Sequence, residues 1–374
     1  MTYSDLQKRS LHSVRKLQEH LRKNHLDAFF VADASNVRYL TTFSGTSGFC
    51  LIFRDSSYFL TDFRYKTQAN SEVISCEIMV FGGLLFDYIA KKFFNRKTMA
   101  RLAIGVEDNL SIDSHGRLGE KLPGSDVVKT DHVIEKLAAV KSKPEVERIK
   151  KACWISGSAL DVLVQEEWKG KREKDLSAAL EFNQKILGGS KESFDTIVAS
   201  GVRGSLPHGV ASEKIVEENE FITIDFGCFY DGYASDITRT FQTGEGVKPK
   251  LKEIYQIVFD AQRKGIDAAR AGVEARKVDG VARSYIDRKG FGNFFAHGLG
   301  HGVGLRIHEL PRISRISKDV LEEGHVITIE PGIYVPRLGG VRIEDDFIVT
   351  RDGVEQLSHF SKEKDFYTSA RGGR

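Results

Sequence analysis

The sequence lacks several features that would define its chemistry or its compartment. No uninterrupted apolar run approaches the roughly 18–20 residues that a membrane-spanning helix needs. The first thirty residues carry many charges and lack the apolar core of a signal peptide. The four cysteines show no C-x-x-C spacing, which gives no support to catalysis by a thiolate. These absences predict a reduced, cytoplasmic protein without a membrane segment.

The sequence also has no large excess of positive or negative charge. Lys plus Arg number 55 against 52 Asp plus Glu, for a net charge of +3. This balance gives no reason to expect nucleic acid or an anionic membrane as the main partner. The length of 374 residues exceeds the usual size of one domain, so we expect two.

Glycine divides the chain, because only eight of the 35 glycines precede residue 144. Before that point, apolar runs such as "LDAFFVAD" alternate with helix-like stretches, which is typical of an α/β domain. Ser142 and Glu145 then form a capping-box pattern that predicts the start of a long amphipathic helix. We therefore expect an α/β domain over residues 1–138 and a second domain over 139–362. We expect the tail over 363–374 to be frayed or disordered.

One phrase occurs twice in the second part. Residues 217–227 read "EENEFITIDFG" and residues 322–332 read "EEGHVITIEPG", and the two agree at six positions. Each is a strand-like run that ends in an acid, Asp225 in the first and Glu330 in the second. We interpret the repeat as an internal duplication, which would relate two half-domains by a pseudo-twofold axis and bring the acidic strand ends together.

Each phrase is followed by a turn and a second acid. Asp236 comes eleven residues after Asp225, with the turn signal Asp231-Gly232 between them. Glu344 comes fourteen residues after Glu330, with the turn between Pro336 and Gly340. Two hairpins would thus each present a nearly facing pair of carboxylates. Such acids would repel one another unless a cation lies between them, so the pattern predicts a metal site.

The segment "HGLGHGVGLRIHE" between the hairpins supplies His297, His301 and His308. Its four glycines in seven residues disfavour a helix, and neither H-E-x-x-H nor the dinucleotide pattern G-x-G-x-x-G is present. An extended segment that approaches a substrate closely fits better. Four carboxylates and an imidazole suit two divalent ions such as Mn²⁺, Co²⁺ or Zn²⁺, which can share a water of lowered pKa.

These motifs resemble those of the pita-bread metallopeptidases, the superfamily of methionine aminopeptidase, aminopeptidase P and prolidase. "HGLGHGVGLRIHE", "PHG" at 207–209, "EPGIY" at 330–334 and "VRIED" at 341–345 are similar to the proline-specific branch. "SNVRYLTTFSGTSGF" and "YFLTDFRY" resemble the creatinase-type domain that precedes the catalytic one. The resemblance implies a two-domain α/β protein, with a creatinase-type domain before a pseudo-twofold α+β pita-bread domain.

The resemblance also implies roles for individual residues. The metal ligands would be Asp225, Asp236, His301, Glu330 and Glu344, around two divalent ions with Mn²⁺ preferred. Glu330 would also shuttle the proton, His208 and His308 would steady the tetrahedral intermediate and the substrate, His297 would lie on the substrate side, and Arg342 would support the acids. Phe194 and Ile307 would be walls of a proline pocket, or simply core residues.

Several alternatives stay open at this point. A metal-free enzyme or a binding module would be expected to lack part of the ligand set, which is complete here. The added amino-terminal domain and His308 disfavour methionine aminopeptidase. Within the proline-specific branch we expect an Xaa-Pro aminopeptidase acting on peptides with proline second, with Xaa-Pro dipeptidase (prolidase) as the alternative. The resemblance further implies a homodimer.

Overall fold

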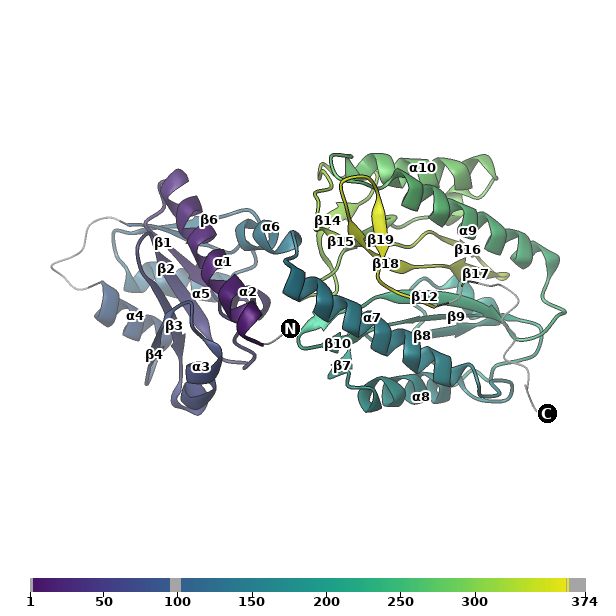
Figure 1. The fold of residues 1–374 in the computed structure, drawn as a ribbon, viewed down its shortest axis with the longest axis horizontal. Coiled ribbons are helices and arrows are strands. Elements are labelled where there is room, and N and C mark those ends of the chain that lie inside the picture. Colours follow the sequence, from purple (N-terminus) through teal and green to yellow (C-terminus); the bar gives the residue numbers. More distant parts are fainter. Residues whose placement is uncertain (1–2, 95–101, 361, 363–374) are drawn as a thin grey trace. The chain divides into compact units, whose positions relative to one another are not determined.

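The computed structural model describes residues 3–94, 102–360 and 362. It divides the chain into two compact units, Met1–Ala138 and Ala139–Arg374. The predicted tail, residues 363–374, lies outside the described residues. Figure 1 labels most of the helices and strands of both units.

The first unit is a mixed sheet between two layers of helices. Its elements in chain order are α1 (Tyr3–Lys23), β1 (Ala28–Val31), α2 (Ala34–Thr41), β2 (Phe49–Phe53), β3 (Ser57–Thr61), the 3₁₀ turn η1 (Phe63–Tyr65), α3 (Lys66–Glu72), β4 (Glu77–Val80), α4 (Leu85–Phe93), β5 (Ala103–Val106), α5 (Ile112–Lys121), β6 (Asp126–Lys129) and α6 (Val133–Ala139).

Strand order in this sheet is β4-β3-β2-β1-β5-β6, with β1, β5 and β6 parallel and β2 antiparallel to both of its neighbours. Because side chains alternate along a strand, the buried central strands β1 and β2 place apolar side chains on both faces of the sheet. On one face Phe30, Leu51 and Ile104 pack with Ile89 of α4 and Leu118 of α5. This is the α/β unit that the alternating apolar and helical stretches predict.

The second unit contains more strands and four long helices. Its elements are α7 (Lys143–Leu163), α8 (Glu173–Ile186), β7 (Lys191–Glu192), β8 (Ile197–Ser200), η2 (Gly201–Ser205), β9 (Phe221–Phe226), β10 (Cys228–Tyr230), β11 (Tyr233–Ala234), β12 (Ile237–Gln242), α9 (Pro249–Ala268), α10 (Ala275–Arg288), η3 (Gly292–Phe294), β13 (Gly300–Gly302), β14 (Glu309–Ile313), β15 (Val326–Ile329), β16 (Gly332–Val335), β17 (Gly339–Arg342), β18 (Asp345–Val349) and β19 (Val354–Gln356).

The elements of the second unit form two halves of similar order. In the first half α7 and α8 precede β9 and pack against the sheet β12-β9-β8, with Leu160, Leu180 and Ile224 in one core. In the second half α9 and α10 precede β15 and pack against the sheet β14-β13-β15-β18-β19 through a second core. Figure 1 shows the two helix pairs on opposite sides of the strands. The repeated phrase therefore corresponds to β9 and β15, one in each half, as a pseudo-twofold arrangement requires.

Both predicted hairpin turns are present. Asp231 and Gly232 have φ of 46° and 81°, as a two-residue hairpin turn requires, and Arg337 turns the second hairpin with φ of 63°. In the second hairpin Gly332 pairs with Arg342, a register that brings Glu330 opposite Glu344.

The first hairpin differs from the expectation. Asp225 pairs with Thr238, so Asp236 is two positions out of register with Asp225 rather than facing it. The reason is that the turn is centred between Asp231 and Gly232, one residue beyond the midpoint of the two acids. The two carboxylates consequently lie diagonally on the hairpin.

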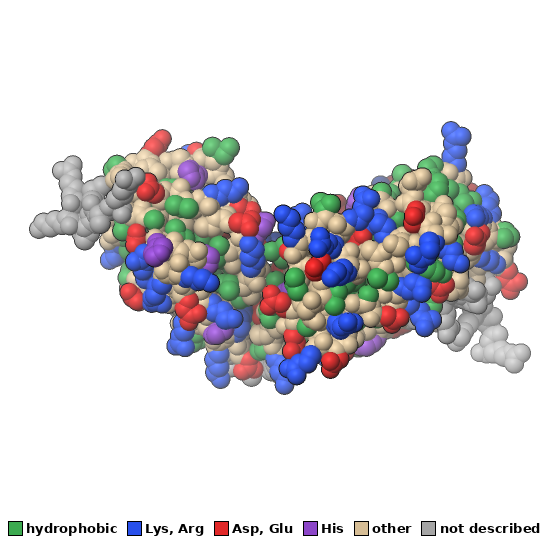
Figure 2. All heavy atoms as spheres, turned by 90° about the horizontal axis from the view of Figure 1, so that it is seen from above, with side chains coloured by type: hydrophobic (Ala, Val, Ile, Leu, Met, Phe, Trp, Pro, Cys, Tyr) green, Lys and Arg blue, Asp and Glu red, His purple; other side chains and the backbone are tan. Residues whose placement is uncertain are grey.

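On the face shown in Figure 2, Lys and Arg side chains are interspersed with Asp and Glu, and apolar side chains are scattered among them. The helices of the described residues include none that is long and apolar enough to cross a membrane. All four cysteines are free thiols.

Candidate active site

The four predicted acids lie at the ends of strands in the second unit. Asp225 is in β9, Asp236 directly precedes β12, Glu330 directly follows β15, and Glu344 lies between β17 and β18. The two hairpins are joined at these ends by Thr238, whose Oγ1 donates to Glu344 Oε2 at 2.6 Å and whose carbonyl accepts from Glu344 N at 3.1 Å. The carboxylates of both halves therefore converge.

The acids line a pocket of about 450 Å³ within the second unit. Every residue that the sequence analysis assigned to the site contributes to its lining, namely Phe194, His208, Asp225, Asp236, His297, His301, Ile307, His308, Glu330, Arg342 and Glu344. Asp195, Ile197, Pro207, Val210, Gly298, Gly300 and Tyr334 complete the lining. Because the lining combines charged and polar side chains with apolar ones, the pocket is suited to a small ligand with both kinds of surface.

Burial and nearby carboxylates disfavour the ionised form of three of these acids, Asp236, Glu330 and Glu344. Burial raises the pKa of Asp236 and of Glu344 well above their usual values, and neighbouring carboxylates raise both further. Burial likewise raises the pKa of Glu330 to about 8. A divalent cation among the three would reverse this effect, since it favours the charged form.

His301 presents a free ring nitrogen to the same carboxylates. Its Nδ1 lies 3.0 Å from the carbonyl of Gly302, which assigns the proton to Nδ1 and leaves Nε2 with its lone pair. Nε2 lies 3.5 Å from Asp236 Oδ2 and 3.4 Å from Glu330 Oε1. Burial, and then the neighbouring His308, lower the pKa of His301 to about 3, so the ring is neutral and able to bind a metal.

The residues present fit a divalent metal. Ligand atoms of Asp236, His301 and Glu344 lie within 4.8 Å of one another. Among the described residues, three buried carboxylate oxygens have no hydrogen-bond partner, namely Asp225 Oδ1, Glu344 Oε1 and Asp346 Oδ1. A buried acceptor without a partner costs free energy unless a ligand satisfies it. Asp225 and Glu344 are acids of the pocket, and a cation there would satisfy their two oxygens, whereas Asp346 does not line the pocket.

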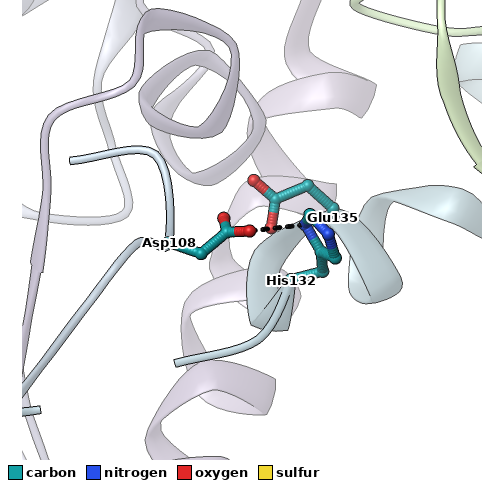
Figure 3. Close-up of side chains that lie close together, drawn as sticks. All are labelled: Asp108, His132 and Glu135. Carbon is teal, nitrogen blue, oxygen red and sulfur yellow. Dashed lines mark ion pairs between the residues drawn. The ribbon is translucent and has the colours of Figure 1, made fainter. Parts of the chain in front are cut away.

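A second cluster of possible metal ligands, in the first unit, does not have the unpartnered buried oxygens that indicate a cation. Figure 3 shows Asp108, His132 and Glu135, whose ligand atoms also lie within 4.8 Å of one another. Here Asp108 Oδ2 lies 3.4 Å from His132 Nδ1, and Glu135 Oε1 accepts from Asn36 Nδ2 at 2.7 Å. All three side chains are half-buried, and neither acid has a buried oxygen without a partner in the described part of the chain. Contacts within the protein account for this cluster.

Arg342 connects the acids to the wall of the pocket. Its Nη2 donates to Asp225 Oδ2 at 2.5 Å, and its Nη1 donates to the Tyr334 hydroxyl at 2.7 Å. Burial opposes the charge of Arg342, but Tyr334, Asp225 and the other acids hold its pKa well above the usual value. The arginine is thus a fixed positive charge behind the carboxylates.

Sequence reasoning missed Tyr334. Its hydroxyl lies 3.0 Å from His297 Nε2, while His297 Nδ1 lies 2.7 Å from the carbonyl of Gly298. The tyrosine therefore donates to His297 and accepts from Arg342, which fixes the orientation of the imidazole. The signal in the sequence was its position four residues after Glu330, on the same side of an otherwise apolar strand.

Asp346 was missed as well. Its Oδ2 accepts from the backbone N–H of Asp236 at 2.9 Å and from the Cys153 thiol at 3.2 Å. Burial raises the pKa of Asp346 to about 7. The residue supports the backbone of a pocket acid from behind, and its signal was three consecutive acids in a strand-like segment.

Family comparisons cover both units. Residues 147–351 match the model of metallopeptidase family M24, and residues 14–140 match the creatinase/prolidase N-terminal domain. The chain is 40% identical over 355 residues to the Xaa-Pro dipeptidase of Pyrococcus furiosus, covering 94% of this chain and 98% of that protein.

Solved structures agree with this assignment. An Xaa-Pro dipeptidase from Bacillus anthracis superposes with a TM-score of 0.91 at 40% identity, covering 95% of this chain and 99% of that one. An X-Pro aminopeptidase from Thermotoga maritima gives 0.84 at 36% identity, covering 93% and 99%. The resemblance expected from the motifs is confirmed. The chain belongs to metallopeptidase family M24, in its proline-specific branch, with a creatinase-type domain before a pita-bread catalytic domain.

Proposed function

We propose that the protein is a metal-dependent Xaa-Pro dipeptidase. The observation that carries the proposal is a pocket in which buried carboxylates with unsatisfied oxygens adjoin histidines and apolar side chains. Its similarity to Xaa-Pro dipeptidases over nearly the whole chain supports the same function. The comparisons therefore favour the dipeptidase, the alternative in the sequence analysis, over the Xaa-Pro aminopeptidase that we expected first.

The proposed cofactor is a pair of divalent ions, Mn²⁺ first, with Co²⁺ or Zn²⁺ as alternatives. The residues that would hold them are Asp225, Asp236, His301, Glu330 and Glu344. When bound, such ions supply a water of lowered pKa and polarise the carbonyl of the scissile bond. The Nδ1–H of His301, fixed on the Gly302 carbonyl, keeps Nε2 directed at this site.

Glu330 is the proposed proton carrier. Its carboxyl is buried, and Oε1 lies 3.4 Å from Thr328 Oγ1 and 3.4 Å from His301 Nε2. The bond before proline is a tertiary amide, so its nitrogen carries no hydrogen and must receive a proton to leave. A carboxyl that takes a proton from the attacking water can return it to that nitrogen.

Other side chains would bind and orient the substrate. His208 and His308 line the pocket as donors for the developing oxyanion and the substrate carboxylate. His297, whose ring is oriented by its hydrogen bonds with Tyr334 and Gly298, would contact the substrate from its side of the pocket. Phe194 and Ile307 supply apolar surface for the proline ring, whose φ is fixed near −65°.

The test compares three substrates with the Mn²⁺-loaded protein. Ala-Pro, Ala-Pro-Ala and Ala-Ala-Ala are incubated separately, and products are followed by mass spectrometry. We expect cleavage of Ala-Pro and little cleavage of either tripeptide. Efficient cleavage of Ala-Pro-Ala would make the protein an Xaa-Pro aminopeptidase, as in the similar Thermotoga protein. Efficient cleavage of Ala-Ala-Ala would overturn specificity for proline.

We also propose that the protein is a homodimer, as the family resemblance implies. The four free thiols are in keeping with a reducing compartment such as the cytoplasm.

A further inference from the structure

One wall of the pocket is the loop of residues 303–308, which joins β13 to β14. Gly302 at its start pairs with Glu309 at its end, so the loop closes a hairpin. Ile307 and His308 of this loop line the pocket, and the His308 ring centre lies 4.3 Å from that of His301. The position of the loop therefore determines where two proposed substrate-binding side chains lie.

The carboxylate of Glu309 lies inside this loop. Its Oε1 accepts from the backbone N–H of Arg306 at 3.0 Å. A Cβ at Gly304 would lie 2.5 Å from Glu309 Oε2, so the carboxylate packs directly against that glycine. Gly304 N in turn donates to the Arg306 carbonyl at 3.0 Å. The Glu309 carboxylate thus fills the loop and holds its backbone in one conformation.

A lysine from a distant part of the chain neutralises this carboxylate. Lys141 lies just before α7, and its Nζ donates to Glu309 Oε2 at 2.7 Å. The two side chains are only 1% and 7% exposed. Removing one partner of such a pair leaves an uncompensated buried charge, which the surrounding structure must move to accommodate.

The backbone around Lys141 is fixed as well. Lys141 N donates to the Gly324 carbonyl at 2.9 Å, and Val140 forms a β-bridge with His325. Residues 324–325 lead directly into β15, which ends at Ile329 just before Glu330. Lys141 therefore reaches Glu309 from a rigid anchor rather than from a mobile segment.

We propose that Lys141 is a positioning residue for the substrate pocket. Acting through Glu309, it holds the loop 303–308 so that Ile307 and His308 face the substrate. The proposal rests on the proposed function for its catalytic consequence, although the conformation of the loop can be measured without activity. A purely structural ion pair would stabilise the fold without acting on His308 in particular.

The first experiment is a double-mutant cycle on the Mn²⁺-loaded protein with a dipeptide such as Ala-Pro. We expect Lys141→Met to lower kcat by up to about 10²-fold, as misplacement of a binding group by about 1 Å can do. In a His308→Ala background the same substitution should lower kcat by a clearly smaller factor, because one of the two side chains that it positions is already gone. The loss of Tm caused by Lys141→Met should be the same in both backgrounds. Equal fold-losses of kcat in the two backgrounds would overturn the proposal.

A matched control separates positioning from loss of stability. Arg148→Met breaks another ion pair of the same unit, between the buried side chain of Arg148 and the half-buried side chain of Asp231, both of which lie outside the pocket. It should lower Tm while leaving kcat unchanged.

The second experiment needs no activity. Hydrogen exchange of the amides in residues 303–309, and that of Arg306 above all, should become at least about tenfold faster in Lys141→Met but not in Arg148→Met. If Lys141→Met does not fold, Gly304→Ala displaces the Glu309 carboxylate without removing a charge, and should accelerate the same amides. Unchanged exchange in a folded variant would refute the proposal. If wild type cleaves no Xaa-Pro dipeptide, the proposed function fails, and the exchange result still decides whether Lys141 holds the loop.

Discussion

In the metal-free protein, Glu330 should make the stability of the fold depend on pH. Burial raises the pKa of Glu330 from its usual 4.5 to about 8. A carboxyl with a higher pKa in the folded than in the unfolded state retains its proton on folding. Between those two pKa values, each rise in pH therefore favours the unfolded state. The substitution that isolates this effect is Glu330→Gln, which resembles the protonated acid but does not titrate.

The magnitude follows from the two pKa values. Between pH 5.5 and 8.0 the carboxyl is ionised in the unfolded state, while in the folded state it ionises only near the upper end. At about 1.4 kcal/mol per pH unit, wild type should lose about 3 kcal/mol of unfolding free energy relative to Glu330→Gln across this interval. Burial lowers the pKa of His297 and of His301, which opposes the trend below pH 6.5, but both variants contain these histidines and the difference cancels them.

The assay is urea unfolding of both proteins in the presence of a chelator, at pH 5.5 and at pH 8.0. Saturating Mn²⁺ should then reverse the order at pH 8.0, because an ionised Glu330 becomes a ligand and binding to the folded state stabilises it. The reasoning would be refuted if the chelated proteins kept the same stability difference at both pH values.

Three further outcomes are expected. Glu330→Gln should fold normally but lower kcat by about 10²–10⁴-fold, as loss of a general acid–base group does. Steady-state kinetics on a metal-loaded sample measure this, and near-normal turnover would contradict the role of Glu330. Tyr334→Phe removes the hydroxyl between Arg342 and His297 and should cost about 1.5–3 kcal/mol in urea unfolding, since the lost hydrogen bond involves a charged group; an unchanged midpoint would contradict the network. Light scattering at micromolar concentration should give the mass of a dimer, and a mass near 41.9 kDa would exclude the proposed assembly.

Much of the site could be predicted because its signals are local. The capping pattern of Ser142 and Glu145 is realised at the start of α7, with Ser142 N donating to Glu145 Oε2 at 2.9 Å. The turn at Asp231-Gly232 depends on residues that tolerate positive φ, and those residues are adjacent in the chain. Acids placed directly after strand-like runs could therefore be assigned to strand ends without a structure.

The pairing of those acids across the hairpins was harder to predict from the sequence. The sequence predicted the first hairpin but not its register, because a shift of one residue in the centre of the turn moves the facing partner by two. Asp225 consequently pairs with Thr238, and Asp236 lies diagonal to it.

Only the tertiary structure decided which groups support the site. Thr238 joins Glu344 across 106 positions of the chain, and Lys141 meets Glu309 across 168. No periodicity or turn signal links residues so far apart, since their contact depends on how sheets and helices pack after they form. Burial has the same origin: the raised pKa of Glu330 arises from the packing of two half-domains around it, which the residue types alone do not determine. The sequence by itself determined which residue types are the proposed ligands and which strands carry them, whereas packing decided their register, their protonation and the side chains that hold them in place.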